Sequence, residues 1–130
     1  MNIQELLETR FNTIKVDKFF DEFVLNNTII VLYSKDYNTL TIWKAHYDYT
    51  MNKWTSGFFI DEFKDFHYEL CPNLWLDTLS TYIDKTEQGL LRCHKCGRWL
   101  NPDKDCWNHS GFVGVVCSNC EPEPIDTSDW

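Results

Sequence analysis

The stretch CHKCGRWLNPDKDCWNHSGFVGVVCSNC, residues 93–120, contains two matched pairs of cysteines. Two residues separate Cys93 from Cys96, two separate Cys117 from Cys120, and 20 residues lie between the pairs. A two-residue gap lets both sulfurs of a pair point at one ion, and two such pairs supply the tetrahedron of thiolates that Zn²⁺ accepts in closed structural sites. The sequence therefore predicts that Cys93, Cys96, Cys117 and Cys120 hold one structural Zn²⁺.

The first pair, Cys93-His-Lys-Cys96-Gly97-Arg98, resembles the first knuckle of the zinc-ribbon family. In that family a glycine directly after the second cysteine permits a left-handed backbone turn. The second pair also resembles a ribbon knuckle, although Glu121 stands where the helpful glycine would be. The resemblance covers residues 93–120, and it implies a fold rather than a function, because ribbons occur in transcription factors, ribosomal proteins, enzymes and binding proteins. Residues 112–116 are expected to form the strand that leads into the second knuckle.

Three alternatives remain open for this cluster. Cys106 and His109, again two residues apart, could replace one pair or help to hold a second ion. The thiols could be reduced and unliganded, but a segment this short and this poor in aliphatic side chains cannot bury a core of its own. Zinc would supply the missing folding free energy, on the order of 10 kcal/mol. A redox role for Cys93 and Cys96 is the third alternative, and Gly97 with the second matched pair favours a knuckle instead.

Outward from the ribbon, residues 1–92 predict an α+β domain with N-terminal helices, a three-stranded antiparallel meander and a further helix. Residues 28–33, 39–49 and 54–60 are rich in β-branched and aromatic side chains, as strands are, and Gly57 is expected to mark a bulge. A helix is expected over residues 74–83, with Asn73 as its cap. Two N-terminal helices are expected from apolar side chains at helical spacing: Ile3, Leu6, Leu7, Phe11 and Ile14 for the first, and Phe19, Phe20, Phe23 and Val24, capped by Asp17, for the second.

The predicted organisation is thus an α+β domain at residues 1–89, a zinc ribbon at 90–120 and an acidic flexible tail at 121–130. The tail contains two prolines and four acidic side chains, so it is expected to be extended. Cys71, which precedes a proline, is expected to be a small buried residue.

The composition suits a globular protein, with 43% apolar residues and a formal net charge of −8. No apolar run approaches the roughly 20 residues that span a bilayer. The N-terminal sequence lacks the basic start and apolar stretch of a secretory signal. Cytoplasmic localisation is therefore expected, where free thiols and zinc thiolates are stable and disulfides are rare.

The charge is spread so that no segment forms a basic platform. Residues 1–92 carry 9 basic and 14 acidic side chains, and residues 93–120 carry 3 basic and 2 acidic ones. Phosphate-driven binding of nucleic acid depends on clustered Lys and Arg, so direct binding to DNA or RNA is disfavoured. An acidic protein instead attracts partners with basic surfaces and is repelled by anionic membranes.

Two groups of side chains are candidates for binding a protein partner. The first is a set of acids in residues 61–70, a segment that could be helical or extended. If it is helical, the acids share one face, where they could imitate nucleic-acid phosphates. The second is a set of tryptophans, which are favoured anchors at protein interfaces. The acidic candidates are Asp61, Glu62, Asp65 and Glu69, and the aromatic candidates are Trp43, Trp54, Trp99 and Trp107.

No catalytic set is evident, because the chain has no phosphate-cradling Gly-rich loop, no nucleophile elbow and no His-Glu-x-x-His helix. The sequence favours a non-enzymatic inhibitor or regulator that occludes the basic surface of a nuclease or other nucleic-acid-binding protein. In charge and size it is similar to small acidic immunity proteins and to phage-encoded inhibitors of defence machinery. One alternative is a nucleic-acid-associated ribbon protein of transcription or related machinery, with Lys95, Arg98 and Lys104 on phosphate and Trp99 or Trp107 stacking on a base. The other is a redox enzyme.

Overall fold

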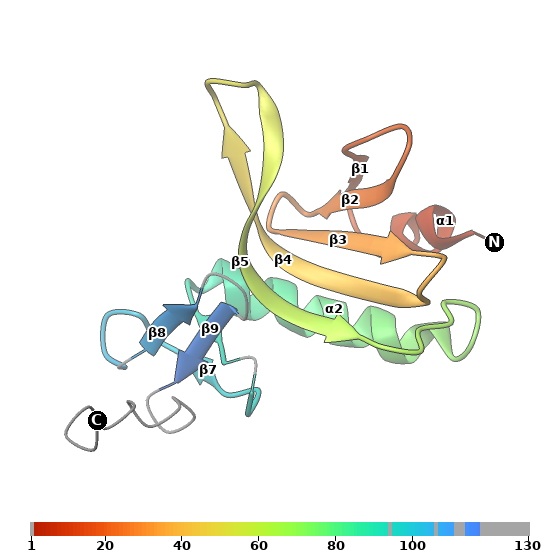
Figure 1. Ribbon diagram of the computed structural model, residues 1–130. Coiled ribbons are helices and arrows are strands. Elements are labelled where there is room, and N and C mark those ends of the chain that lie inside the picture. The colour runs from red at the N-terminus through yellow and green to blue at the C-terminus, as the bar shows by residue number, and fades with distance from the viewer. Residues whose placement is uncertain (1, 94, 106, 111–113, 118–130) are drawn as a thin grey trace, which may run out of the picture.

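The computed structural model describes residues 2–93, 95–105, 107–110 and 114–117 (Figure 1). Five strands form an antiparallel sheet in the order β1-β2-β3-β4-β5, and two small hairpins follow. The protein is therefore a mixed helix-and-strand fold, as predicted. The elements are α1 (Ile3–Glu8), β1 (Thr13–Lys15), β2 (Asp21–Leu25), β3 (Ile29–Ser34), β4 (Thr39–Asp48), β5 (Lys53–Phe63), α2 (Pro72–Glu87), β6 (Leu91–Arg92), β7 (Trp99–Leu100), β8 (Trp107–Ser110) and β9 (Gly114–Cys117).

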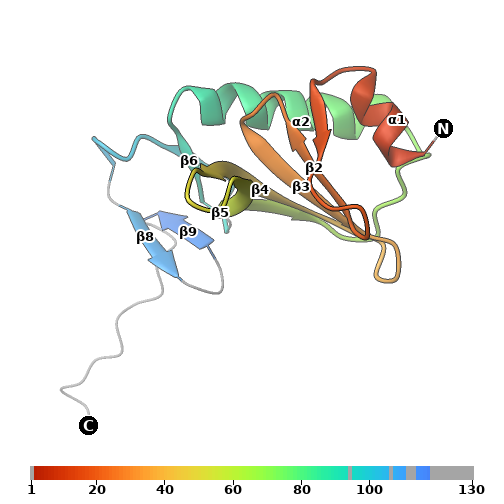
Figure 2. The ribbon, with the colours of Figure 1, turned by 90° about the horizontal axis from the view of Figure 1, so that it is seen from above.

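Both helices lie on the same face of the five-stranded sheet (Figure 2). The main core forms between them and the sheet, where alternate strand residues point inward, as the two-residue period of a strand requires. Its members include Ile3 and Leu7 from α1, Leu79 and Ile83 from α2, and Phe23, Leu25, Val31, Leu40 and Ile42 from the sheet.

The N-terminal segment differs from the sequence-based expectation. Helix α1 begins with a capping box between Asn2 and Glu5, but it ends at Glu8 rather than continuing to Ile14. The predicted second helix is wrong, because residues 21–25 form strand β2. Pairing with β1 and β3 lets β2 bury side chains on both of its faces, and this tertiary gain outweighs the local helical spacing of the phenylalanines.

The predicted meander is present as the last three strands of the larger sheet, β3, β4 and β5. Register shifts between Ile42 and Trp43 and between Trp43 and Ala45 mark two irregularities in the pairing of β4 with β5. Bulges bend and twist the strands that carry them. The end of this hairpin beyond the second irregularity, residues 45–56, projects from the sheet, and we call it the arm (Figure 1). Gly57 lies at the second irregularity, where a Cβ atom would stand 3.0 Å from the Lys44 carbonyl oxygen.

Helix α2 is longer than predicted. It begins at Pro72, where the missing N–H costs nothing, and its N-cap is Cys71 rather than Asn73. Cys71 adopts a left-handed conformation (φ 45°) and is exposed, so the expectation that it is buried is wrong. The cause is that Pro72 starts the helix at the surface and leaves the thiol outside it.

The two small hairpins lie beside one end of β5 (Figure 1). A second core cluster forms there from Leu91, Leu100, Val115 and Val116, and Phe58 of β5 packs against it. The predicted division at residue 89 stays a prediction, and the predicted tail at 121–130 lies outside the described residues. Within the described part of the chain, no helix combines the length and the apolar character that a membrane crossing demands.

Candidate metal centre

Three cysteine sulfurs meet at the junction of the small hairpins. The Sγ atoms of Cys93, Cys96 and Cys117 all lie within 4.8 Å of one another. The Cys96 and Cys117 sulfurs are 3.7 Å apart, although 21 positions separate them in the sequence. Such convergence of thiols from distant segments is what a metal site requires.

The loop between β6 and β7 positions the first two cysteines. The Cys93 N–H donates to the Arg98 carbonyl at 2.8 Å, and the Gly97 N–H donates to the Cys93 carbonyl at 2.9 Å. These two bonds close a tight turn that folds Cys96 back towards Cys93. Gly97 has φ +78°, a conformation that glycine adopts freely and other residues rarely do, so it permits this turn as predicted.

The third cysteine comes from the end of β9. Val115, Val116 and Cys117 are buried, and their strand packs beside β5 and β6. Cys93 is also buried, whereas Cys96 is exposed. The cluster therefore has a closed side formed by apolar residues and an open side at Cys96.

Donors around the Cys93 sulfur favour its thiolate form. Burial raises the pKa of this thiol, but the backbone N–H groups of Cys117, Cys96 and Lys95 and the Cys96 thiol together outweigh burial and lower the pKa from 9.0 to about 6. Because the thiolate is the form that binds metals, this electrostatic environment suits a cation.

The separation of two of the three sulfurs suits a tetrahedral zinc complex. With Zn–S bonds of about 2.3 Å, two ligands of a regular tetrahedron are about 3.8 Å apart, and the Cys96 and Cys117 sulfurs are at nearly that separation. The predicted fourth ligand, Cys120, and the alternative ligand Cys106 lie outside the described residues, as does the side chain of His109.

An arginine next to the cluster connects the β6–β7 hairpin to the sheet. Arg92 Nη1 donates to the Ile60 carbonyl at 3.1 Å and lies 3.5 Å from Asp61 Oδ1. Its guanidinium stands 5.4 Å from the centre of the Tyr82 ring. The opposite nitrogen, Nη2, lies 3.0 Å from the position that a Cβ on Gly97 would take. Sequence reasoning missed Arg92, and its only signal is its position directly before the first cysteine.

The predicted acidic residues do not share a helical face. Asp61 and Glu62 belong to strand β5, where consecutive side chains point to opposite faces. Asp61 turns inward and accepts a hydrogen bond from the Tyr82 hydroxyl, whereas Glu62 is exposed. Asp65 and Glu69 are exposed in the segment between β5 and α2.

Three of the four candidate tryptophans are each packed against another aromatic ring. Trp43 meets Phe59 with ring centres 5.0 Å apart, and Trp54 meets Tyr47 at 5.2 Å. Trp99 lies 5.8 Å from the Tyr82 ring, at the edge of the main core. The side chain of Trp107 lies outside the described part of the structure.

Comparison of the chain with models of protein families, with curated proteins and with solved structures finds no match.

Proposed function

We propose that this chain is a non-enzymatic binding protein whose C-terminal ribbon is held by one structural Zn²⁺. The observation that carries the proposal is the convergence of Cys93, Cys96 and Cys117, with the Cys96 and Cys117 sulfurs at a separation that suits Zn²⁺. Cys120, three positions after Cys117 in the sequence, completes the ligand set in this proposal. A fully coordinated tetrahedral zinc leaves no open position for a substrate, so the metal acts on stability rather than on chemistry.

The proposed role of the zinc is to fix the ribbon against β5. The second core cluster contains few side chains, and without the ion the hairpins have little else to keep them together. With the ion bound, Phe58 and Arg92 connect the ribbon to the main sheet. In this proposal the zinc centre stabilises the contacts of β5 with β6 and β9.

The proposed partner is a protein with a basic surface, such as a nuclease or another nucleic-acid-binding protein. The net charge of −8 and the exposed Glu62, Asp65 and Glu69 support this choice, because such a protein attracts cationic surfaces. The proposed mechanism is occlusion, in which carboxylates occupy positions meant for phosphates.

Zinc analysis by plasma mass spectrometry tests the metal assignment on the full chain purified under reducing conditions. About one zinc per chain is expected. Cys117→Ser should abolish tight zinc retention and disorder the ribbon, seen as a loss of dispersed amide signals from β6 to β9. Cys71→Ser is the matched control, because that thiol is exposed and lies outside the cluster, and it should leave zinc content unchanged.

A metal-free protein with an ordered ribbon would overturn the proposal. A salt-dependent affinity for DNA or RNA would instead support the nucleic-acid alternative. Among its candidate side chains, Arg98 lies 3.8 Å from Asp105 and Trp99 packs on Tyr82, so neither is fully available to a nucleic acid.

A further inference from the structure

The second face of the five-stranded sheet, which we call the open face, has no helix of the described residues on it. Figure 1 shows both helices behind the sheet, and Figure 2 shows the same arrangement from above. The main core takes its sheet residues from the helical side. The open face consists of the alternate strand positions, and the register of the sheet identifies them.

An apolar row crosses all five strands on the open face. Directly paired residues of antiparallel strands point to the same side. Val24 and Ile30, at the centre of the row, are buried although they lie outside the main core cluster. Towards its ends the row is accessible, since Ile14 is 40% exposed and Phe59 is half-buried. The pairs that define the row are Ile14 with Val24, Val24 with Ile30, Ile30 with Trp43, and Trp43 with Phe59.

The neighbouring row on the same face ends in two carboxylates. Glu22 pairs with Leu32, Leu32 with Thr41, and Thr41 with Glu62. Glu22 and Glu62 therefore stand on β2 and β5, three strand spacings apart, or about 14 Å. Together they place negative charge at the two ends of this row, which lies along one side of the apolar row.

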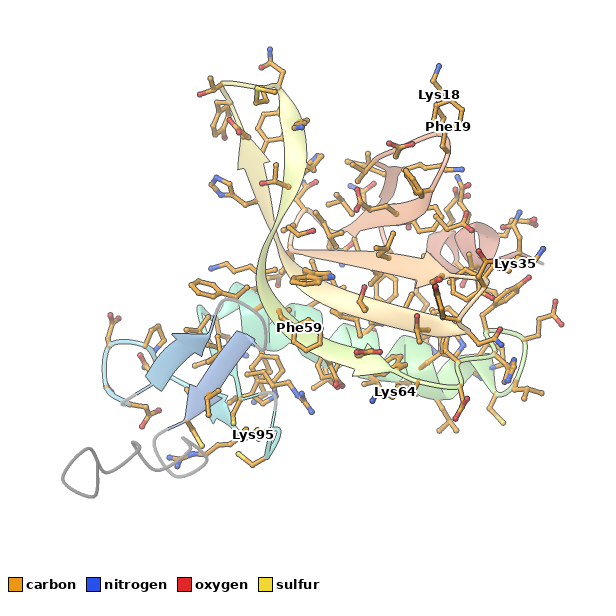
Figure 3. The ribbon with its side chains drawn as sticks, in the orientation of Figure 1. Lys18, Phe19, Lys35, Phe59, Lys64 and Lys95 are labelled. Atoms are coloured by element: carbon orange, nitrogen blue, oxygen red, sulfur yellow. The ribbon has the colours of Figure 1, made fainter. Side chains whose placement is uncertain are left out.

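The lysines of these strands point elsewhere. Lys15 pairs with Phe23 and Lys44 pairs with Ile29, and both partners belong to the main core, so both lysines start from the helical face. Lys18 lies beside Phe19 at the tip of the β1–β2 loop, away from Phe59 on the sheet (Figure 3). At the described strand positions of the five-stranded sheet, the charged side chains on the open face are thus Glu22 and Glu62.

The arm extends the open face beyond the sheet. Along β4, Tyr47 follows Trp43 on the same side, and it pairs with Trp54 of β5. Its ring also lies 4.9 Å from that of Tyr49, which is 83% exposed. The apolar row therefore continues onto an aromatic cluster that the arm holds away from the helices (Figure 1).

We propose that the open face binds a segment of a partner protein that carries both apolar side chains and Lys or Arg. This inference rests on the proposed function and names the surface that performs it. The accessible ends of the apolar row, at Ile14 and Phe59, and the arm would take the apolar side chains. Glu22 and Glu62 would pair with the basic ones. This charge arrangement selects a basic segment and disfavours an acidic one.

The test uses the zinc-loaded full chain and a short blocked peptide in which Ile and Lys alternate. Titration followed by amide chemical shifts should locate the peptide on β2, β3 and β4. Glu62→Lys should weaken binding about tenfold, because it reverses an exposed charge on this face. Ile14→Ser should weaken binding several-fold by shortening the apolar row.

Two variants on α2, outside the open face, are the matched controls. Asp84→Lys makes the same charge change at an exposed position, and Leu74→Ser removes an apolar side chain that is 70% exposed. Both should bind the peptide as the parent does. Folding of every variant is checked by its thermal unfolding.

Equal weakening by Glu62→Lys and Asp84→Lys would overturn the proposal, because binding would then reflect net charge alone. Equal binding of a peptide that alternates Ile and Glu would overturn it as well. A dimer in light scattering that Ile14→Ser dissociates would assign the open face to a second copy of the chain. Absence of peptide binding to a protein that retains zinc overturns this inference alone, whereas peptide binding by a protein that is purified metal-free with β6 to β9 ordered overturns the zinc assignment alone.

Discussion

The Tyr82 hydroxyl of α2 donates a hydrogen bond to the Asp61 carboxylate of β5. Asp61 also faces Arg92 of β6, which directly precedes the first cysteine of the candidate metal centre. One carboxylate thus connects the helix, the sheet edge and the β6–β7 hairpin. Because it lies between partly buried groups, its contacts are less screened by water than those of surface ion pairs.

Tyr82→Phe should destabilise the protein by about 2 kcal/mol, the usual scale for a hydrogen bond to a charged acceptor. Urea unfolding followed by circular dichroism measures the change. The same substitution in an Asp61→Asn background should cost clearly less, because the two residues share one interaction. An equal loss of stability in both backgrounds would show that the Tyr82 hydroxyl stabilises the protein through a group other than Asp61.

The same bond predicts a loss of stability in alkali. Burial first, and then the hydrogen bond to Asp61, raise the pKa of Tyr82 above its ordinary value of 10.0. The folded state therefore keeps a proton that the unfolded state releases, so stability is complete below pH 10 and declines as the pH rises beyond it. Tyr82→Phe should flatten this decline in urea titrations between pH 9 and 11, which bracket the ordinary tyrosine value.

Gly97→Ala should destabilise the ribbon more than Gly89→Ala. Both glycines have positive φ, +78° and +82°, so both substitutions carry the backbone cost of about 1 kcal/mol. Only at Gly97 would the new Cβ meet another group, the Arg92 guanidinium at 3.0 Å. Thermal unfolding of the zinc-loaded variants measures the difference, and equal losses would show that Arg92 moves aside freely.

Thr86→Val should stabilise the protein by about 1 kcal/mol. Among the described residues, Thr86 Oγ1 is a buried polar atom without a hydrogen-bond partner. Valine keeps the shape and removes the unsatisfied hydroxyl. Thr86→Ser is the control, since it keeps the hydroxyl and deletes the methyl group, and it should destabilise. A loss of stability in Thr86→Val would mean that water satisfies the hydroxyl in the narrow cavity beside it, whose volume is about 10 Å³.

Glu22→Gln should stabilise the free protein at neutral pH and weaken its binding to a basic partner. Burial, and then the charge of Asp17, raise the pKa of the Glu22 carboxyl above 4.5. The folded state therefore binds a proton at Glu22 more tightly than the unfolded state does. The stability that this binding contributes is fully present below pH 4.5 and is lost as the pH rises through the raised pKa. The gain from glutamine should therefore appear in urea unfolding at pH 7 and vanish at pH 4. A gain of equal size at both pH values would exclude the charge as its cause.

Sequence periodicity predicted the last three strands and α2 well, because each is a long segment with a consistent pattern. It failed at residues 17–24, where phenylalanines at helical spacing also suit a strand with both faces buried. Helix and strand cannot be distinguished there without the pairing partners that β1 and β3 provide. The irregularities on either side of Trp43, where the arm begins, likewise depend on strand pairing, in this case between β4 and β5.

The candidate metal site was predicted more completely than its surroundings. Spacing alone named Cys93, Cys96 and Cys117, since metal geometry limits how ligands can be arranged along a chain. Spacing gave no sign of Arg92 or Tyr82, because their contacts join segments that are far apart in the sequence. Spacing also failed to distinguish Asp61 from Glu62. These residues belong to a strand, so Asp61 points inward and Glu62 points outward.

The sequence by itself predicted that Cys93, Cys96 and Cys117 come together, and where the main strands and the long helix lie. Those properties follow from spacing and from local periodicity. Only the tertiary structure decided that β2 is a strand, that Asp61 connects Arg92 of β6 to α2, and that Glu22 and Glu62 border one apolar face. These features depend on strand register, and register is set by the free energy of the packed sheet rather than by any single segment.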